Sequence, residues 1–218
     1  MTAPSSTSSV WADVKSRVQP HWKLKFFGIS AFITVFFFAY FGLQKHPFFP
    51  VHMIPLTALD RMIPFEPGVL GLYLSLWFYV SLPPTFMRTR PELFAYGWIA
   101  GGVAVTGLAF FFFWPTSIPV TTGIEWRSFP GFSWLKSVDA AQNACPSLHV
   151  AFAVFSAVWF DRVLREMPAA RVLRLVNAAW AFGIVYSTLA TRQHVALDAY
   201  AGTALGLLFA CYRPAALK

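Results

Sequence analysis

The chain has 218 residues, of which 57% are hydrophobic and only 12% are charged, and its mean hydropathy is +0.56. Soluble domains have roughly half apolar and about a quarter charged residues, so this composition excludes an ordinary soluble domain. Several apolar runs approach the length of about 20 residues that crosses a bilayer. The sequence therefore predicts an all-α, polytopic membrane protein.

The formal net charge is +8. A basic soluble domain would suggest nucleic-acid binding, but in a membrane protein an excess of Lys and Arg marks the cytoplasmic loops. We therefore expect no nucleic-acid partner. The two cysteines, Cys145 and Cys211, fall near opposite ends of the predicted spans, so we expect no disulfide between them.

The chain begins with a polar, Ser-rich segment that leads through basic residues into an apolar stretch. The long polar lead is not typical of a cleavable signal peptide. We interpret residues 1–24 as a cytoplasmic tail and residues 25–218 as a six-helix membrane domain. Six apolar stretches of suitable length predict the spans of this domain, at about 25–43, 69–86, 93–114, 147–164, 173–191 and 194–212.

Basic residues divide unequally between the two sides of these spans when the N-terminus is placed inside. Twelve of the 17 Lys and Arg residues then lie inside, where the net charge is +8, and the outer side has no net charge. The positive-inside rule describes this asymmetry, so we expect both termini to be cytoplasmic. The inner residues are Lys15, Arg17, Lys23, Lys25, Arg88, Arg90, Arg162, Arg165, Arg171, Arg174, Arg213 and Lys218, and the outer residues are Lys45, Arg61, Arg127, Lys136 and Arg192.

Two long loops fall on the outer side, at about residues 44–68 and 115–146. The first is rich in proline and apolar residues, which favours an interfacial or re-entrant cap. The second carries Trp and Phe side chains that suit the headgroup level. In the sixth span, Gly202 and Gly206 form a GxxxG pattern, which we interpret as close packing against a neighbouring span.

Three ionisable residues at the outer ends of spans carry the functional hypothesis: His149, His194 and Asp198. Charged groups in such places are costly and indicate a functional site. His194 and Asp198 are four residues apart, so they share a helical face, and the carboxylate can orient the ring so that its free nitrogen attacks or takes a proton. A second histidine can protonate a leaving group. The helix start near Ser147 favours a bound anion such as phosphate.

Two motifs around these residues resemble those of the type 2 phosphatidic acid phosphatase (PAP2) superfamily. Residues 146–149 (Pro-Ser-Leu-His) resemble its second motif, and Ser187, His194 and Asp198 have the spacing of its third, SRxxxxxHxxxD. The sequence around His194 and the stretch at residues 60–67 resemble the branch of inositolphosphorylceramide synthase-type phosphotransferases. The resemblance covers about residues 55–210.

The resemblance implies phosphoryl transfer without a metal ion or other cofactor. His194 would be the nucleophile that forms a phosphohistidine, Asp198 would orient it, and His149 would protonate the leaving alcohol and then activate the acceptor. Ser147 and Ser187 would help to hold the phosphate. The implied substrate is a membrane lipid phosphate at the extracytoplasmic face, and the acceptor is water or an alcohol such as inositol or a sugar.

The sequence departs from the family pattern at the basic residues. Thr188 follows Ser187 where the family has Arg, and no KxxxxxxRP first motif is found on the outer side. The Arg-Pro pair at residues 90–91 falls on the inner side. Because phosphoryl transfer needs positive charge near the equatorial oxygens, we expect outer basic residues to supply it, with Arg192 favoured because it lies two residues before His194. The candidates are Arg192, Arg127, Lys136 and Arg61.

Other interpretations stay open at this point. The histidines can be interfacial residues, Ser147 a helix cap and Asp198 a buried acid bonded to the backbone. The lack of a first motif favours a decayed enzyme or a non-enzymatic lipid-binding or carrier protein. A zinc site formed by His149, His194 and Asp198 has suitable ligands but ranks below metal-independent transfer.

Overall fold

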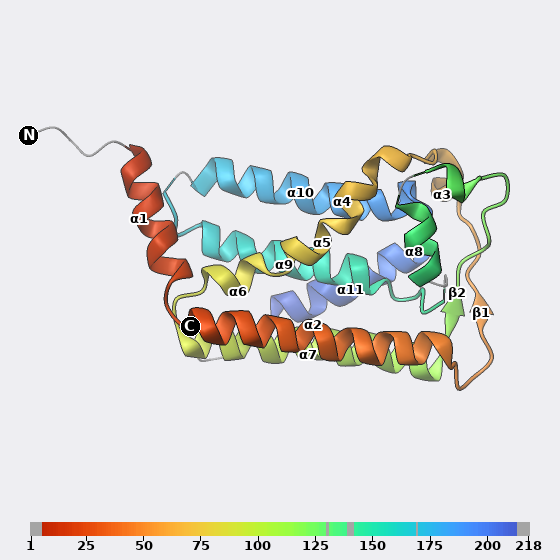
Figure 1. Ribbon diagram of the computed structural model, residues 1–218, viewed down its shortest axis with the longest axis horizontal. Coiled ribbons are helices and arrows are strands. Elements are labelled where there is room, and N and C mark those ends of the chain that lie inside the picture. The colour runs from red at the N-terminus through yellow and green to blue at the C-terminus, as the bar shows by residue number, and fades with distance from the viewer. Residues whose placement is uncertain (1–5, 130, 139–141, 169, 213–218) are drawn as a thin grey trace, which may run out of the picture.

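The protein is an elongated bundle of helices in the computed structural model (Figure 1), and 72% of it is helical. In the part of the chain that the structure describes, three helices are long and apolar enough to cross a membrane, by length and composition: α2 (Trp22–Lys45), α7 (Arg90–Phe113) and α10 (Ala170–Ala190). The apolar helix α11 (Ala196–Cys211) is shorter, and α9 (Leu148–Leu164) packs against α7, α10 and α11. The structure describes residues 6–129, 131–138, 142–168 and 170–212.

The predicted second span is not one regular helix. It consists of α4 (Leu70–Leu74), α5 (Leu76–Tyr79) and α6 (Leu82–Phe86). The Ser75 hydroxyl donates to the carbonyl of Leu72 at 2.6 Å at the first break, and such bonds back to the preceding turn bend helices. Two prolines in the first turn of α6 remove further N–H donors. The length of this apolar run therefore predicted a helical segment, but it did not predict the breaks between the three short helices.

A short helix, α1 (Ser6–Val18), lies across one end of the bundle, where a tail was expected (Figure 1). Its Arg17 side chain is buried and pairs with Asp13 at 2.9 Å and with Glu166 at 3.3 Å. Arg88 also pairs with Asp13. These ion pairs join α1 to the segments that precede α7 and follow α9.

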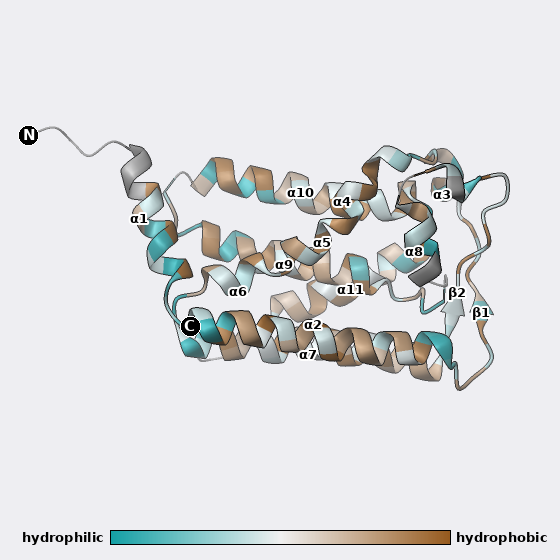
Figure 2. Cartoon of the chain, viewed as in Figure 1, coloured by the Kyte–Doolittle hydropathy of each residue, from teal (hydrophilic) through white to brown (hydrophobic). Residues whose placement is uncertain are grey.

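The basic residues of the predicted inner side gather at this same end. They lie in α1, at the starts of α2, α7 and α10, and at the end of α9. Figure 2 shows hydrophilic residues at both ends of the bundle and apolar residues along its middle. The basic residues that the sequence places on one side of the spans therefore lie at one end of the bundle. Arg213 and Lys218 lie outside the described residues.

The two long loops meet at the opposite end of the bundle, beside the starts of α9 and α11 (Figure 1). Strands β1 (His52–Met53) and β2 (Thr116–Ser117) pair in parallel and join the loops. The second loop is also held to the start of α9, because the Cys145 amide donates to the Thr116 hydroxyl at 2.8 Å. The remaining short elements here are α3 (Ala58–Met62), η1 (Pro67–Val69), η2 (Trp126–Ser128) and α8 (Phe132–Val138).

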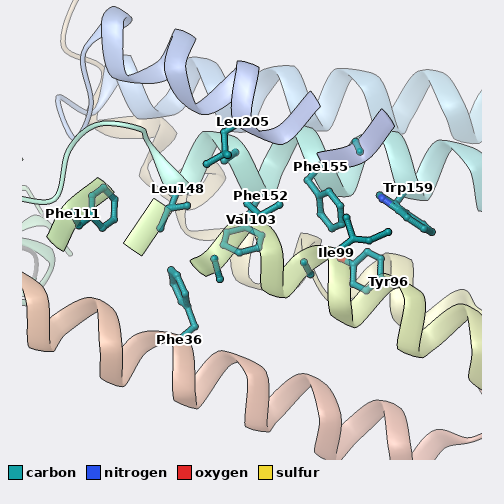
Figure 3. Close-up of a cluster of buried hydrophobic side chains, with 14 of the residues drawn as sticks. Phe36, Tyr96, Ile99, Val103, Phe111, Leu148, Phe152, Phe155, Trp159 and Leu205 are labelled. Carbon is teal, nitrogen blue, oxygen red and sulfur yellow. The ribbon is translucent and has the colours of Figure 1, made fainter. Parts of the chain in front are cut away.

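The largest apolar cluster lies between α2, α7, α9 and α11, as Figure 3 shows. Its centre is aromatic: Phe155 is fully buried, and Tyr96 packs on it with ring centroids 5.2 Å apart. Helix α2 contributes Phe36, which meets Phe152 edge to face at 5.5 Å. Otherwise α2 is sparsely packed, since only 6% of its most apolar stretch is buried inside the protein.

Helices α9 and α11 approach so closely that backbone touches backbone. A Cβ added to Gly206 would lie 2.5 Å from the Ala151 carbonyl oxygen, and one added to Gly202 would collide with the Ser147 carbonyl. The GxxxG pattern therefore packs α11 against α9, as predicted.

We expect Gly206→Ala to destabilise the protein by about 1–3 kcal/mol, because the added methyl group forces the two helices apart. Thermal unfolding of the detergent-solubilised protein measures this effect. The matched control is Gly101→Ala, where nothing lies within 4 Å of the added carbon and better helix propensity should leave stability equal or higher. Equal melting temperatures for the two variants would contradict the close approach.

Candidate active site

The turn between α10 and α11 holds His194 directly before the last helix. Its Nδ1 lies 3.1 Å from Oδ2 of Asp198, and the other carboxylate oxygen accepts the Val195 amide at 3.1 Å. Asp198 is completely buried, whereas the His194 side chain is 11% exposed. The carboxylate is thus fixed by the backbone and fixes the imidazole in turn, which leaves Nε2 on the side away from Asp198.

His149 lies in the first turn of α9, at the same end of the bundle. Its ring stacks on Tyr73, with centroids 4.1 Å apart and planes 11° apart, and meets Trp77 edge to face at 6.1 Å. The ring centroids of His149 and His194 are 6.4 Å apart. The structure therefore brings together two histidines that are 45 positions apart in the sequence.

The His149 ring has a nitrogen with an unmet hydrogen-bonding capacity. Nε2 is buried, and it has no hydrogen-bond partner among the described residues. Buried polar atoms are nearly always paired, so an exception of this kind calls for an explanation. A ligand that binds between the two histidines would supply the missing partner.

Ser147 joins α9, which carries His149, to α11, which directly follows the turn of His194. Its hydroxyl accepts the Val150 amide at 3.2 Å and so caps α9, and its own amide donates to the Asp198 carbonyl at 3.0 Å. The capping role considered from the sequence is therefore present. The same residue connects the first turn of α9 to the first turn of α11.

Both histidines line a cavity of about 360 Å³ between α2, the α4–α5 segment, α8 and α9. Aromatic and aliphatic side chains form most of its wall, and Asn143 is a polar exception. No Lys or Arg of the described residues belongs to this lining. Asn143 is buried, has a positive φ of 56° and donates to the Tyr40 carbonyl at 3.2 Å.

The residues expected to hold phosphate are placed in different ways. Lys136 reaches Gln193, the neighbour of His194, with 3.4 Å between Nζ and Oε1, and it lies over the Trp126 ring. Ser187 is buried within α10, where its hydroxyl donates to the Ile184 carbonyl at 2.7 Å. Arg127 is the middle residue of η2, but its side chain lies outside the described part of the structure.

Arg192, the favoured cation, is engaged elsewhere. Its two terminal guanidinium nitrogens donate to the carbonyls of Asp60 and Ile63, both at 2.7 Å. Its backbone has a positive φ of 56°, which is uncommon for a residue other than glycine. In this arrangement Arg192 fastens the turn that carries His194 to the end of α3. Arg90, by contrast, lies at the far end of the bundle, as the predicted topology requires.

Asp60 is a member of the site region that the residue pattern alone did not reveal. Its buried carboxylate accepts the Thr57 amide and hydroxyl at 2.7 Å through one oxygen, and the Ala196 amide at 2.7 Å through the other. Asp60 therefore caps its own helix and α11 at once. The Thr-x-x-Asp spacing signals the first cap, but no local signal announces the second.

A zinc site was one of the alternatives that the sequence left open. Among the described residues, no group of three or more His, Cys, Asp or Glu side chains lies close enough together to hold a metal ion. Cys145 and Cys211 are both free thiols and lie at opposite ends of the bundle.

Burial raises the pKa of the Cys145 thiol to about 11, and the nearby Asp198 carboxylate adds to this shift. Because the thiolate is the reactive form, we expect slow alkylation of Cys145 at pH 7–8 and a rate that continues to rise up to about pH 11. The measurement is the rate of iodoacetamide labelling against pH in a Cys211→Ser background, with free cysteine as the reference. A rate that levels off near pH 8.5, as for an ordinary thiol, would contradict this environment.

The sequence profile of the PAP2 superfamily matches residues 68–216, which is more than half of the chain and includes both histidines and Asp198. No curated protein and no solved structure shows significant similarity to the chain. Members of the superfamily are phosphatases and phosphotransferases that act on phosphate esters. The histidine pair, the buried carboxylate and the profile match lead to one conclusion: this chain belongs to the PAP2 superfamily.

Proposed function

We propose that the protein is an integral-membrane phosphatase or phosphotransferase that acts on lipid phosphates through a phosphohistidine. The observation that carries this proposal is the pair of histidine rings 6.4 Å apart, one of them held by a buried carboxylate, in an apolar cavity of a PAP2 chain. The two histidines supply the nucleophile and the proton donor that phosphoryl transfer requires.

In the first step, Nε2 of His194 attacks phosphorus while the bond from phosphorus to the leaving alcohol oxygen breaks. His149 gives its proton to that oxygen, so the products are a neutral alcohol and phosphohistidine 194. Asp198 accepts the Nδ1 proton in a hydrogen bond of 3.1 Å, and its negative charge stabilises the positive charge that develops on the ring.

In the second step, water or an alcohol attacks the phosphoryl group and gives its proton to His149. The bond between nitrogen and phosphorus breaks, which returns His194 to its starting state. Water releases inorganic phosphate, whereas an alcohol such as inositol or a sugar receives the phosphoryl group. Both outcomes use the same three side chains.

The phosphate has two sources of positive charge in this proposal. The first turn of α9, a helix of 17 residues, presents backbone amides and the positive end of its dipole. Lys136, bonded to the residue next to His194, supplies a cation. Arg192 acts indirectly, because it holds the turn that carries His194. Ser187 also acts indirectly, because it lies inside α10 and its carbonyl accepts the Thr191 amide just before the turn of His194.

The proposed orientation places the site at the extracytoplasmic face. Basic residues are concentrated at the end with α1, and cytoplasmic ends of membrane proteins are enriched in Lys and Arg. The histidines lie at the other end (Figures 1 and 2). We propose six membrane crossings: α2, the α4–α6 segment, α7, α9, α10 and α11. The branch assignment to inositolphosphorylceramide synthase-type enzymes stays part of this proposal.

The direct test is phosphate release from lipid phosphates in detergent with EDTA present. We expect His194→Ala to abolish release and the acid-labile phosphoenzyme, and His149→Gln to reduce turnover by about 10²–10⁴-fold, as expected when a general acid is lost. His46→Ala is the matched control, because His46 lies at the C-terminal end of α2 outside the site. Where water is a poor acceptor, inositol or a sugar is added and transfer is measured.

Activity of His194→Ala equal to that of the wild type would exclude the proposed nucleophile. Release that disappears with EDTA and returns with a metal ion would exclude metal-independent transfer. If no phosphoenzyme forms and no acceptor supports turnover, the non-enzymatic lipid-binding interpretation replaces this proposal.

Asp60 should act as a positioning residue. We expect Asp60→Ala to reduce kcat by about 10²-fold with little change in KM, because a small displacement of His194 impairs the reaction more than binding. Glu66→Gln, an exposed acid in the same loop, is the control and should retain wild-type kcat. A change in KM alone, or a variant with normal kcat, would contradict the positioning role.

A further inference from the structure

A second apolar cavity extends along the bundle away from the histidines. It has a volume of about 310 Å³ and runs between α2, the α5–α6 segment and α7. Exposed aromatic side chains such as Phe94 and Trp98 border it, so the cavity is a groove that opens toward the surroundings of the bundle. Its wall is almost entirely apolar, which suits an aliphatic occupant.

This groove adjoins the histidine cavity, because the two share part of their lining. Phe36, Trp77 and Phe152 line both. Trp77 makes the connection most directly, since its ring also meets the His149 ring at 6.1 Å. A molecule with its phosphate between the histidines can therefore extend its chain past Trp77 and into the groove. This shared lining distinguishes the groove from an apolar surface that only bilayer lipid would cover.

Lys25 lies at the far end of the groove. Among the described residues it is the one charged member of the lining, and its side chain is buried. The ammonium group donates to the carbonyls of Arg17 at 2.5 Å and Thr85 at 2.9 Å, so its charge is turned toward the junction of α1 and α6. Its methylene groups therefore form the part of Lys25 that lines the groove.

The residues of α2 that line the two cavities indicate how long a chain they can accommodate. Tyr40 lines the histidine cavity and Leu24 lines the far end of the groove. They are sixteen residues apart, which corresponds to about 24 Å of helix. A fully extended chain advances about 1.2 Å per bond, so this distance accommodates roughly 16–20 carbons.

We infer that the groove between α2 and α7 binds a single unbranched aliphatic chain of the substrate, while its phosphate lies between His149 and His194. This inference rests on the proposed function and narrows its substrate class to phosphates that carry a long, slender chain. The sparse packing of α2 has a role in this arrangement, because it leaves room for the chain where a tightly packed helix would not.

Two glycines allow the groove to be filled without a clash. Gly28 of α2 and Gly97 of α7 both line it, and nothing lies within 4 Å of a Cβ added to either. Gly42 and Gly101 occupy the same two helices and have equally open surroundings, but they do not line the groove. Gly28→Leu and Gly97→Leu thus have matched controls in Gly42→Leu and Gly101→Leu.

The experiment compares kcat/KM for hexyl, dodecyl and octadecyl phosphate in one detergent. We expect the wild type to prefer octadecyl phosphate, and Gly28→Leu and Gly97→Leu to lower the octadecyl-to-hexyl ratio by about tenfold or more, since a leucine side chain displaces several methylene groups whose burial favours binding. Gly42→Leu and Gly101→Leu should keep the wild-type ratio. Hexyl phosphate turnover with an unchanged ratio in all four variants would overturn the groove and leave the proposed function intact.

A second measurement covers variants that fail to fold and a wild type that releases no phosphate. Octadecyl phosphate with a diazirine at the chain end is irradiated with the wild-type protein, and labelled peptides are mapped. We expect labels at residues 24–29 or 93–98, competed by octadecyl phosphate but not by phosphatidylcholine. Labels elsewhere, or equal competition by phosphatidylcholine, would overturn the inference because the groove would then hold bulk lipid.

Discussion

The backbone contact between α9 and α11 determines the rest of the site. Gly202 and Gly206 remove the side chains that would separate the two helices, and the approach allows the Ser147 amide to donate to the Asp198 carbonyl. Ser147 caps the helix of His149, and Asp198 holds His194. The relative position of the histidines is therefore set by backbone atoms, which are more rigid than the side chains that they carry.

A second set of contacts fixes the turn that carries His194 from outside the bundle. Helix α3 is only five residues long, yet Asp60 caps both α3 and α11, and Arg192 returns two hydrogen bonds to its end. A buried carboxylate is stable only when its oxygens accept hydrogen bonds. The position of α3 and the position of the turn that carries His194 therefore depend on each other. The proline-rich loop is thus part of the site and does more than cover it. Its parallel pairing with the second loop extends the same support to the start of α9.

Sequence reasoning succeeded where a signal is local or repeats with a helical period. Run lengths located the helical segments, and the four-residue spacing correctly paired His194 with Asp198. It failed where a residue's partner is distant. The contacts of Asp60 with Ala196 and of Arg192 with Ile63 span more than 120 positions, and they leave no periodic trace. The breaks in α4–α6 and the docking of α1 also depend on hydroxyl and ion-pair contacts that hydropathy does not record.

The unpartnered nitrogen of His149 connects this architecture to its proposed chemistry. A buried polar atom without a partner costs the free protein about 1–3 kcal/mol, and aromatic packing against Tyr73 and Trp77 keeps the ring from turning toward solvent to find one. A phosphate ester between the histidines would satisfy that nitrogen, so part of the cost is recovered only when substrate is bound. In an apolar cavity such a hydrogen bond is also stronger than in water. In the proposed mechanism, the same surroundings that make His149 costly to bury would leave its nitrogen ready to hold the leaving oxygen, which gives a reason for a histidine in an otherwise apolar wall.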